Sequence, residues 1–320
     1  MIDFVAKRYW YFLLSVVILV PGIISLFAFG LKPSIEFSSG STMTVQFDNA
    51  VNLTDLRSEM AALGHGDAVV QSVGQSGKEY LLRTRTLEPE QKDAQGNVIP
   101  SEKEAIEEAL TARFGALKVV DYYSVSPTVA SEIVQKTLFA AVIAAVGILL
   151  YITWAFRKVA KSFRYGVSAI IALAHDVILV VGTFALLGKL FNIEVDAMFI
   201  VGVLTVMGYS VHDTIVVFDR IRENLKRGTG YDLETTVNNS IMETLGRSLN
   251  TSLTTLFVLF ALFLFGGTTI RNFVLVLILG IATGTYSSIF VAAQCLVVWE
   301  KGEIGRFFNR VLGKKQPAVS

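Results

Sequence analysis

The stretch "GYSVHDTIVVFDRIREN", residues 208–224, decides how this chain folds and raises its main chemical question. It continues the apolar run "AMFIVGVLTVM" (197–207) and places His212 and Asp213 side by side before that run has ended. A carboxylate within the hydrocarbon part of a bilayer costs several kcal/mol, so such residues mark functional sites by default. If this run crosses a membrane, Asp213 must have a partner or a task.

The composition indicates a membrane protein. Of the 320 residues, 52% are hydrophobic and only 17% are charged, and the mean hydropathy is +0.55. Soluble domains carry about 25% charged residues. The net charge of +1 gives no field that would favour binding to nucleic acid. The single cysteine, Cys295, lies within an apolar run, cannot form an intrachain disulfide and is interpreted as a packing residue.

Six apolar runs are long enough to cross a bilayer. The first, "YWYFLLSVVILVPGIISLFAFGL" (9–31), is too long for a signal peptide and lacks a small-residue cleavage site, so it predicts a retained transmembrane helix. The others lie near 137–156, 165–188, 197–218, 248–266 and 272–299. The sequence therefore predicts an α-helical polytopic protein with six transmembrane helices. Its expected parts are helix 1 within 1–31, an insert at 32–135, helices 2–6 within 136–299, and a tail at 300–320.

Lysine and arginine predict the orientation, because they gather on the cytoplasmic side of a membrane. They precede the first run and follow the second, fourth and sixth: Lys7, Arg8, Arg157, Lys158, Lys161, Arg164, Arg220, Arg222, Lys226, Arg227, Lys301, Arg306, Arg310, Lys314 and Lys315. Both termini are therefore expected in the cytoplasm, and residues 32–135 are expected to be extracytoplasmic.

The insert reads as a small α/β domain. Its alternating segments and helical spacings follow the order βαββαβ, with strands at 41–47, 67–73, 79–85 and 118–125 and helices at 53–64 and 101–115. Asn52 is an expected N-cap, and Ser101 with Glu104 resembles a capping box. This order predicts a ferredoxin-like domain. The segment "LEPEQKDAQGNVIP" (87–100) is predicted to be a flexible loop.

Three ionisable residues inside the apolar runs are candidates for function: Asp176, Asp213 and Arg247. Asp213 lies about five residues from the cytoplasmic end of the fourth run, roughly 7–8 Å deep, whereas Asp176 lies near the midplane of the third. Asp213 shares one helical face with Gly202, Val206 and Tyr209, and such a face should point at protein.

The fifth run begins with "GRSLNTSLTTL" (246–256), which carries a polar face of Arg247, Asn250, Thr251 and Thr254. Three further residues, Ser248, Ser252 and Thr255, extend this face on one side. An apolar helix that starts this way is expected to turn its polar face inward. Arg247 then reaches the depth of Asp213. A carboxylate beside an arginine stays ionised, whereas one left alone in a dry site takes up a proton, so a movable pair could act as a proton-coupled switch. A static ion pair for Asp213, a packing hydrogen bond to a neighbouring helix for Asp176 and an interfacial anchor for Arg247 remain alternatives.

Enzyme chemistry is not expected. Asp176 and Asp213 are estimated to differ in depth by roughly 8–10 Å, too far for the shared proton of an aspartyl protease dyad. The sequence has no Ser/His/Asp arrangement, Walker loop, nucleotide fingerprint or zinc-ligand spacing. We therefore expect no bound cofactor or metal. His175 and His212 are read as satisfied interior histidines, with proton relay as the alternative.

Three stretches, "LAHDVILVVGTFALL" (173–187), 208–224 and 246–256, closely resemble the signatures of the SecF family, within the resistance-nodulation-division (RND) superfamily. Six spans with a large loop after the first match throughout, and the resemblance covers nearly the whole chain. Two positions depart from the family pattern. Ser39 in "FSSG" (37–40) stands where the Phe-x-Gly-Gly motif has its first glycine, and His212 stands where asparagine is expected.

The resemblance implies an RND-type half-transporter of the bacterial cytoplasmic (inner) membrane. It implies partnership with SecD, with the SecYEG channel and YajC, and indirectly with SecA. It further implies that the proton motive force, or a sodium gradient, drives late export of a translocating preprotein. Asp213 and Arg247 match the family's proton-pathway residues, and Asp176 falls in another characteristic motif. Residues His212, Tyr209, Asn250, Thr251 and Thr254 would support them. An RND exporter of small molecules or lipids and a passive assembly scaffold are the competing functions.

Overall fold

The structure is a computed structural model that describes residues 3–73, 77–92, 98–158, 161–228 and 232–303. The chain divides into two compact units. We call Met1–Lys32 with Phe139–Ser320 the membrane unit, and Pro33–Leu138 the insert domain. The insert domain extends past the boundary expected at residue 135 and ends at Leu138. It therefore includes the first residues of helix α5 (Pro127–Ala155).

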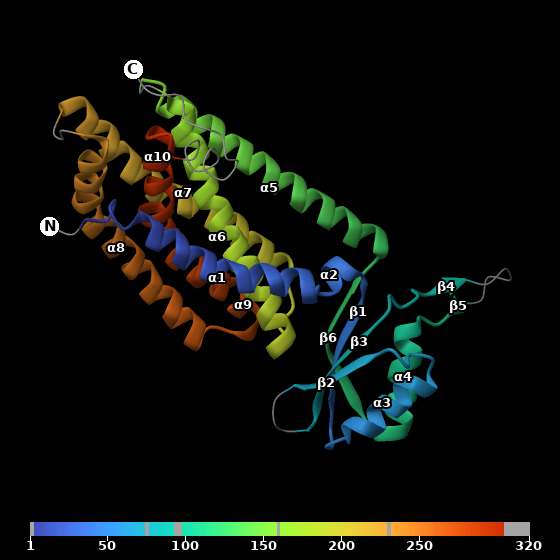
Figure 1. The fold of residues 1–320 in the computed structure, drawn as a ribbon. Helices are drawn as coiled ribbons and strands as arrows, with labels where there is room; N and C mark the ends of the chain where they lie inside the picture. The colour runs from blue at the N-terminus through green and yellow to red at the C-terminus, as the bar shows by residue number, and fades with distance from the viewer. Residues whose placement is uncertain (1–2, 74–76, 93–97, 159–160, 229–231, 304–320) are drawn as a thin grey trace. The chain divides into compact units, whose positions relative to one another are not determined.

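The insert domain has the predicted ferredoxin-like topology (Figure 1). Its antiparallel sheet has the strand order β2-β3-β1-β6, so β3 lies between β1 and β2, as in a split βαβ unit. The elements are β1 (Gly40–Phe47), α3 (Leu53–Ala62), β2 (Val69–Val73), β3 (Glu79–Thr84), α4 (Glu102–Phe114) and β6 (Leu117–Val125). Alternate β1 residues Met43, Val45 and Phe47 pack with Leu56 of α3 and Leu110 of α4 to form the core.

Both helices of the insert domain begin where their caps predict. The Asn52 side chain accepts a hydrogen bond from the Thr54 amide, and Ser101 with Glu104 forms the reciprocal capping box. The predicted loop at 87–100 is partly wrong, because β4 (Gln91–Lys92) pairs with β5 (Val98–Ile99). Residues 93–97 of that loop lie outside the described residues. A short helix that the sequence did not signal, α2 (Ile35–Ser38), precedes β1.

The membrane unit contains the six long apolar helices that the sequence predicts. They are α1 (Arg8–Phe29), α5, α6 (Ser162–Phe191), α7 (Ala197–Arg227), α8 (Leu233–Phe265), and a sixth built from α9 (Thr268–Ser287), the π-helix η1 (Ser288–Ala292) and α10 (Ala293–Glu300). Helices α6, α7 and the sixth are the most buried, whereas α1, α5 and α8 leave broad apolar faces uncovered. These faces suit contact with lipid or with a partner.

Small residues bring α7 and α9 close together. A Cβ atom added at Gly280 would overlap the Val206 side chain, and one added at Gly202 would lie 2.9 Å from Val276. Gly280 therefore serves helix packing, and the prediction that the face shared by Gly202, Val206 and Asp213 points at protein is confirmed.

The backbone at Ser39 and Gly40 is strained where the sequence departs from the Phe-x-Gly-Gly pattern. Ser39 has φ 61° and ψ 164°, a region that is populated essentially by glycine. Gly40 has φ 134°, and a Cβ atom there would lie 2.6 Å from the Thr84 carbonyl oxygen. The second glycine of the motif is therefore required sterically, and the first position holds a strained serine.

Replacing Ser39 by glycine should stabilise the start of β1 by about 1 kcal/mol or more, because such strain costs about 1–3 kcal/mol. Hydrogen–deuterium exchange of β1 and β3 peptides in the full-length protein should slow several-fold. Gly40→Ala is the opposing control and should accelerate the same exchange. Unchanged exchange in Ser39→Gly would show that the serine sits there without strain.

Glu102, at the start of α4, makes contacts with three other residues of the insert domain. Its carboxylate binds the Arg85 guanidinium, accepts the Glu88 amide N–H and lies 3.4 Å from His65 Nε2. Burial raises the pKa of Glu102, but the hydrogen bonds from Glu88 and Arg85 outweigh it, and the net pKa lies below its usual range.

A carboxyl whose pKa is lowered in the folded state stabilises that state above its unfolded pKa, and the stabilisation is lost as the pH falls through the folded value. Exchange protection of α4 should therefore decrease as the pH falls below about 4.5, the ordinary pKa of glutamate. Glu102→Gln should lower protection at pH 7 and remove this part of the acid response. An identical acid response in the variant would contradict the assignment.

Candidate functional site

Asp213 is buried in the membrane unit, with 2% of its surface exposed. Its Oδ2 lies 3.5 Å from Ser252 Oγ of α8 and 3.4 Å from Thr285 Oγ1 of α9. Those hydroxyls are only 2.5 Å apart, and Thr285 also donates to the Ile281 carbonyl at 2.9 Å. Because each hydroxyl has one proton to give, the carboxylate competes with closer acceptors. Asp213 is therefore buried and weakly held.

Asp176 of α6 is fully buried and strongly held. Ser210 of α7 and Ser287 of α9 each donate a hydroxyl to its Oδ2 at 2.6 Å. Its Oδ1 lies 2.9 Å from Nδ1 of His175. Three short contacts are enough to satisfy an ionised carboxylate in a dry site. Asp176 thus joins α6, α7 and α9 at one point.

The two carboxylates are supported by the same helices. Ser210 precedes Asp213 by one turn of α7, and Thr285 precedes Ser287 by two residues of α9. The hydroxyl groups around each carboxylate are nevertheless different. None of the hydrogen bonds found within the described ranges links Asp176 directly to Asp213.

Arg247 lies apart from Asp213 in this conformation. Its side chain is exposed and lines a groove of about 510 Å³ between α7 and α8, together with Ile215, Val216, Asp219, Arg220, Glu223, Glu243 and Thr244. Within the described residues, none of the ion pairs joins it to Asp213. The side chain that does approach Asp213 is that of His212, whose Nδ1 is 3.8 Å from Asp213 Oδ1 and which is 68% exposed.

The polar face expected to turn inward on α8 is only partly buried. Arg247, Asn250, Thr251 and Thr254 are exposed, and Thr254 satisfies its hydroxyl on the Asn250 and Thr251 carbonyls. The neighbouring row with Ser248 and Ser252 is the one that packs inward. The expectation was wrong for the first row within this chain, because the buried stripe of α8 is rotated by about one residue, or about 100°. Tyr209 is half-buried with its hydroxyl lacking a partner among the described residues.

Sequence reasoning missed three hydroxyl residues of the site: Ser210, Thr285 and Ser287. A signal was present, because "TGTYSS" (283–288) is a polar run inside the sixth apolar segment. The π-helix η1 begins at its last residue, Ser288. Such irregular turns are frequent at functional sites.

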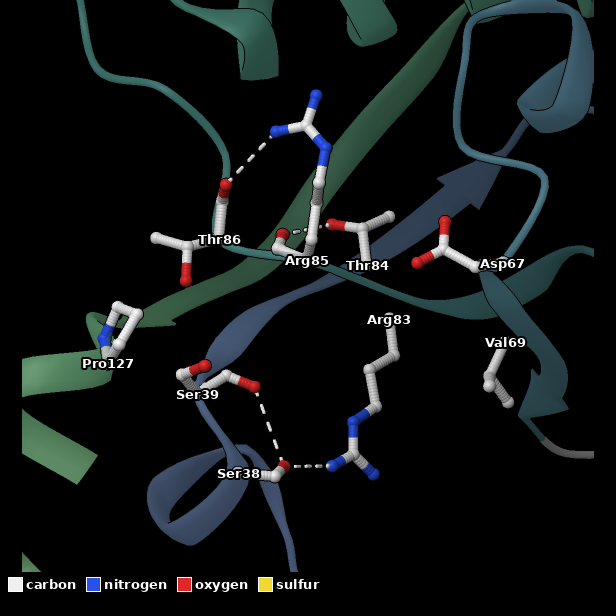
Figure 2. Close-up of a pocket in the computed structure, with 9 residues that line it drawn as sticks. All are labelled: Ser38, Ser39, Asp67, Val69, Arg83, Thr84, Arg85, Thr86 and Pro127. Atoms are coloured by element: carbon white, nitrogen blue, oxygen red, sulfur yellow. Dashed lines mark hydrogen bonds between the residues drawn. The ribbon is translucent and has the colours of Figure 1, made fainter. Parts of the chain in front are cut away.

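Two further groups of polar residues make well-defined contacts. At the predicted cytoplasmic end, Arg8 pairs with Glu234 and Glu303, which joins α1 to α8 and to the end of the sixth helix. On the insert domain, a pocket of about 480 Å³ contains Arg83, which donates to Ser38 Oγ and to the Pro33 carbonyl (Figure 2). Among the described residues no group of three His, Cys, Asp or Glu side chains could hold a metal ion.

Comparison with known proteins matches most of the chain to the family that its sequence resembles. Residues 105–302 match the family "Protein export membrane protein SecD/SecF, C-terminal", and residues 24–51 match the "SecD/SecF GG Motif". The chain is 49% identical over 311 residues to the protein translocase subunit SecF of Thermobaculum terrenum, with 97% of this chain and 98% of that protein covered. It is 40% identical over 316 residues to the SecF subunit of Anaerolinea thermophila, with 97% and 98% covered.

The relatives named SecDF are longer than this chain. The chain is 33% identical over 317 residues to the protein translocase subunit SecDF of Bacillus subtilis, covering 94% of this chain but 38% of that protein. The crystal structure of SecDF from Thermus thermophilus, described as a translocon-associated membrane protein, superposes with a TM-score of 0.75 at 31% identity. It covers 94% of this chain and 39% of that one. The relatives carry the name of a translocase subunit and not of an enzyme. With the family matching more than half of its length, the chain belongs to the SecF family of protein translocase subunits, as a multi-pass protein of the inner membrane.

Proposed function

We propose that this chain is the SecF half of a SecD–SecF pair that uses the proton motive force to promote late stages of preprotein export. In this proposal Asp213 binds and releases the proton. The observation that carries it is the contrast between the two buried carboxylates. Asp176 has three short hydrogen bonds, whereas Asp213 has only contacts of 3.4–3.5 Å and one histidine at 3.8 Å.

A weakly held buried carboxylate is suited to changing its protonation state. Without a strong donor or cation beside it, an ionised carboxylate in a dry helix bundle is costly, and proton uptake removes that cost. With Arg247 beside it, the ionised form would be stabilised instead. Arg247 now lies in the groove between α7 and α8, and Asp213 lies on the Ser252 side. We therefore assign this conformation to the state of the switch in which Asp213 and Arg247 are separated.

The energy supply fits such a switch. One elementary charge that crosses 100 mV is worth about 2.3 kcal/mol. A proton gradient can thus bias two helix arrangements that differ by a few kcal/mol. A sodium ion could act in the same way, since Asp213, Ser252 and Thr285 offer only oxygen atoms. Movement of the insert domain would convert the helix rearrangement into work on the preprotein.

The uncovered polar groups of α7 and α8 support a second helical half. His212, Arg247, Asn250 and Thr251 are exposed within or near the apolar segments. Facing lipid, such groups are unfavourable, so they are expected to face protein. The SecDF relatives, of which this chain covers about two fifths, contain additional sequence that could supply this half. SecD is the proposed partner, and the SecYEG channel, YajC and SecA belong to the same proposal by family resemblance.

Asp213→Asn should abolish the gradient-dependent stimulation of preprotein translocation into inverted membrane vesicles that contain this chain and SecD. The amide cannot exchange a proton, although it retains the size of the carboxylate. Translocation driven by ATP alone should persist, and co-purification with SecD should show that the complex assembles. A passive scaffold predicts full stimulation in the variant, and an exporter of small molecules predicts no effect of the chain on translocation.

A photoreactive p-benzoylphenylalanine in place of Thr251 should cross-link to SecD in membranes, because this face is expected to meet the partner half. Val142, on the exposed apolar face of α5, provides the matched control and should give adducts with lipid only. The adducts are identified by mass and by antibody to SecD. Cross-linking from position 142 but not from 251 would place the partner on the other side of the bundle.

A further inference from the structure

His175 and Asp176 form a buried pair that lies outside the Asp213 switch. The His175 side chain is 6% exposed, and its Nδ1 lies 2.9 Å from Asp176 Oδ1. Its second ring nitrogen, Nε2, is buried and has no hydrogen-bond partner among the described residues. Buried polar atoms are paired in the great majority of cases, so an unpaired basic nitrogen calls for an explanation.

The contacts of Asp176 determine which nitrogen carries the proton. Ser210 and Ser287 both donate to Oδ2 at 2.6 Å, which favours the ionised carboxylate. An ionised carboxylate only accepts hydrogen bonds, so His175 must donate from Nδ1. In the neutral ring Nε2 then bears the free lone pair. Nε2 of His175 is therefore the basic atom of the pair, and it is also the nitrogen that has no hydrogen-bond partner among the described residues.

The charge balance gives this atom a role. With a neutral ring, the pair carries one uncompensated negative charge in the interior of the helix bundle, which is unfavourable. One proton on Nε2 produces an imidazolium beside a carboxylate, and the pair becomes neutral overall. The hydroxyls of Ser210 and Ser287 can keep their hydrogen bonds in both states. Proton uptake therefore leaves these two hydrogen bonds in place.

We propose that His175 and Asp176, held by Ser210 and Ser287, form a second proton-binding site of the membrane unit, separate from Asp213. A hydronium ion gives its proton to the lone pair of Nε2, an N–H bond forms and a water molecule is left; release is the reverse. The functional part of this inference rests on the proposed proton coupling of the complex, whereas the binding of the proton does not.

The surroundings add other titratable or charged groups, but only Asp176 hydrogen-bonds to His175. Helix η1 contributes none. The elements packed against α6 carry Tyr286 on α9, Tyr11 on α1, Asp213 and His212 on α7, and Glu300 on α10, which pairs with Lys161 and Arg164. Of these groups, Tyr286 faces the His175 ring, with 6.1 Å between the ring centres.

A positive charge on His175 is expected to change the contact between α9 and α1. The His175 and Tyr286 rings lie 6.1 Å apart and tilted by 30°. The Tyr286 hydroxyl donates to the Tyr11 carbonyl at 3.0 Å and lies 3.3 Å from Ser15 Oγ. An imidazolium is attracted to an aromatic face, so protonation should change how α9 holds α1. Helix α1 leads directly into the insert domain along the chain.

The chain has only three histidines, His65, His175 and His212, which makes a direct test practical. Full-length protein, labelled with ¹⁵N in the histidine rings and held in lipid nanodiscs, should give three sets of ring signals. Variants His65→Gln, His175→Gln and His212→Gln assign them. We expect the neutral His175 ring to carry its proton on Nδ1 and to gain a second ring proton, on Nε2, when the pH is lowered. Asp176→Asn should no longer take up that proton over the same titration.

His175→Asn is the discriminating variant in the complex with SecD, because its amide can donate to Asp176 in place of Nδ1 but has no basic nitrogen. We expect assembly with SecD to be retained and the pH profile of gradient-stimulated translocation to change. A His175 signal that stays neutral from pH 5 to 9 in the wild type would overturn the proposed site. An unchanged pH profile in His175→Asn would overturn its role in coupling.

The two hypotheses fail separately. If Asp213→Asn loses stimulation while His175 does not titrate, the proposed function stands and the second site falls. If His175 titrates while Asp213→Asn retains full stimulation, the second site stands and the Asp213 switch falls.

Discussion

The helix bundle depends on the need to satisfy the Asp176 carboxylate away from water. Asp176 is satisfied only because Ser210 and Ser287 approach it from two other helices at 2.6 Å. Each hydrogen bond to a buried charged group is worth about 1.5–3 kcal/mol, and leaving the charge unpaired costs more. The carboxylate therefore sets the relative rotation of α6, α7 and α9, and the glycines at 202 and 280 provide the close approach that this rotation needs.

Much of this architecture is encoded locally. Apolar runs of sufficient length predict the six helices, and the alternation of strands with caps at Asn52 and Ser101 predicts the ferredoxin-like insert. The site is encoded differently. Asp213 and Asp176 stand out because a charge in an apolar run is rare, but Ser210 and Ser287 look like ordinary packing residues in any one helix. Their importance arises from helix rotations, which single-helix periodicity does not give.

Because single-helix periodicity does not give helix rotation, it also does not show which part of the polar face of α8 is buried. Spacing alone shows that Arg247, Asn250, Thr251 and Thr254 share a face with Ser248 and Ser252 beside them. It does not show which row faces its own chain. The structure buries the serine row and leaves the Arg247 row exposed. In the proposed pair of halves the Arg247 row would face the partner, and that arrangement is a property of two chains and not of one.

Helix α1 is held to the rest of the membrane unit along its length and at the residues that follow it. Arg8 fixes one end to Glu234 and Glu303, and Gly22 packs tightly against Gly182 of α6 in the middle. At the other end Lys32 pairs with Glu194 in the connection between α6 and α7. These contacts fix α1 and the residues that follow it to the other helices of the membrane unit. Pro33 comes directly after Lys32, and its ring restricts the backbone torsion φ where the chain enters the insert domain.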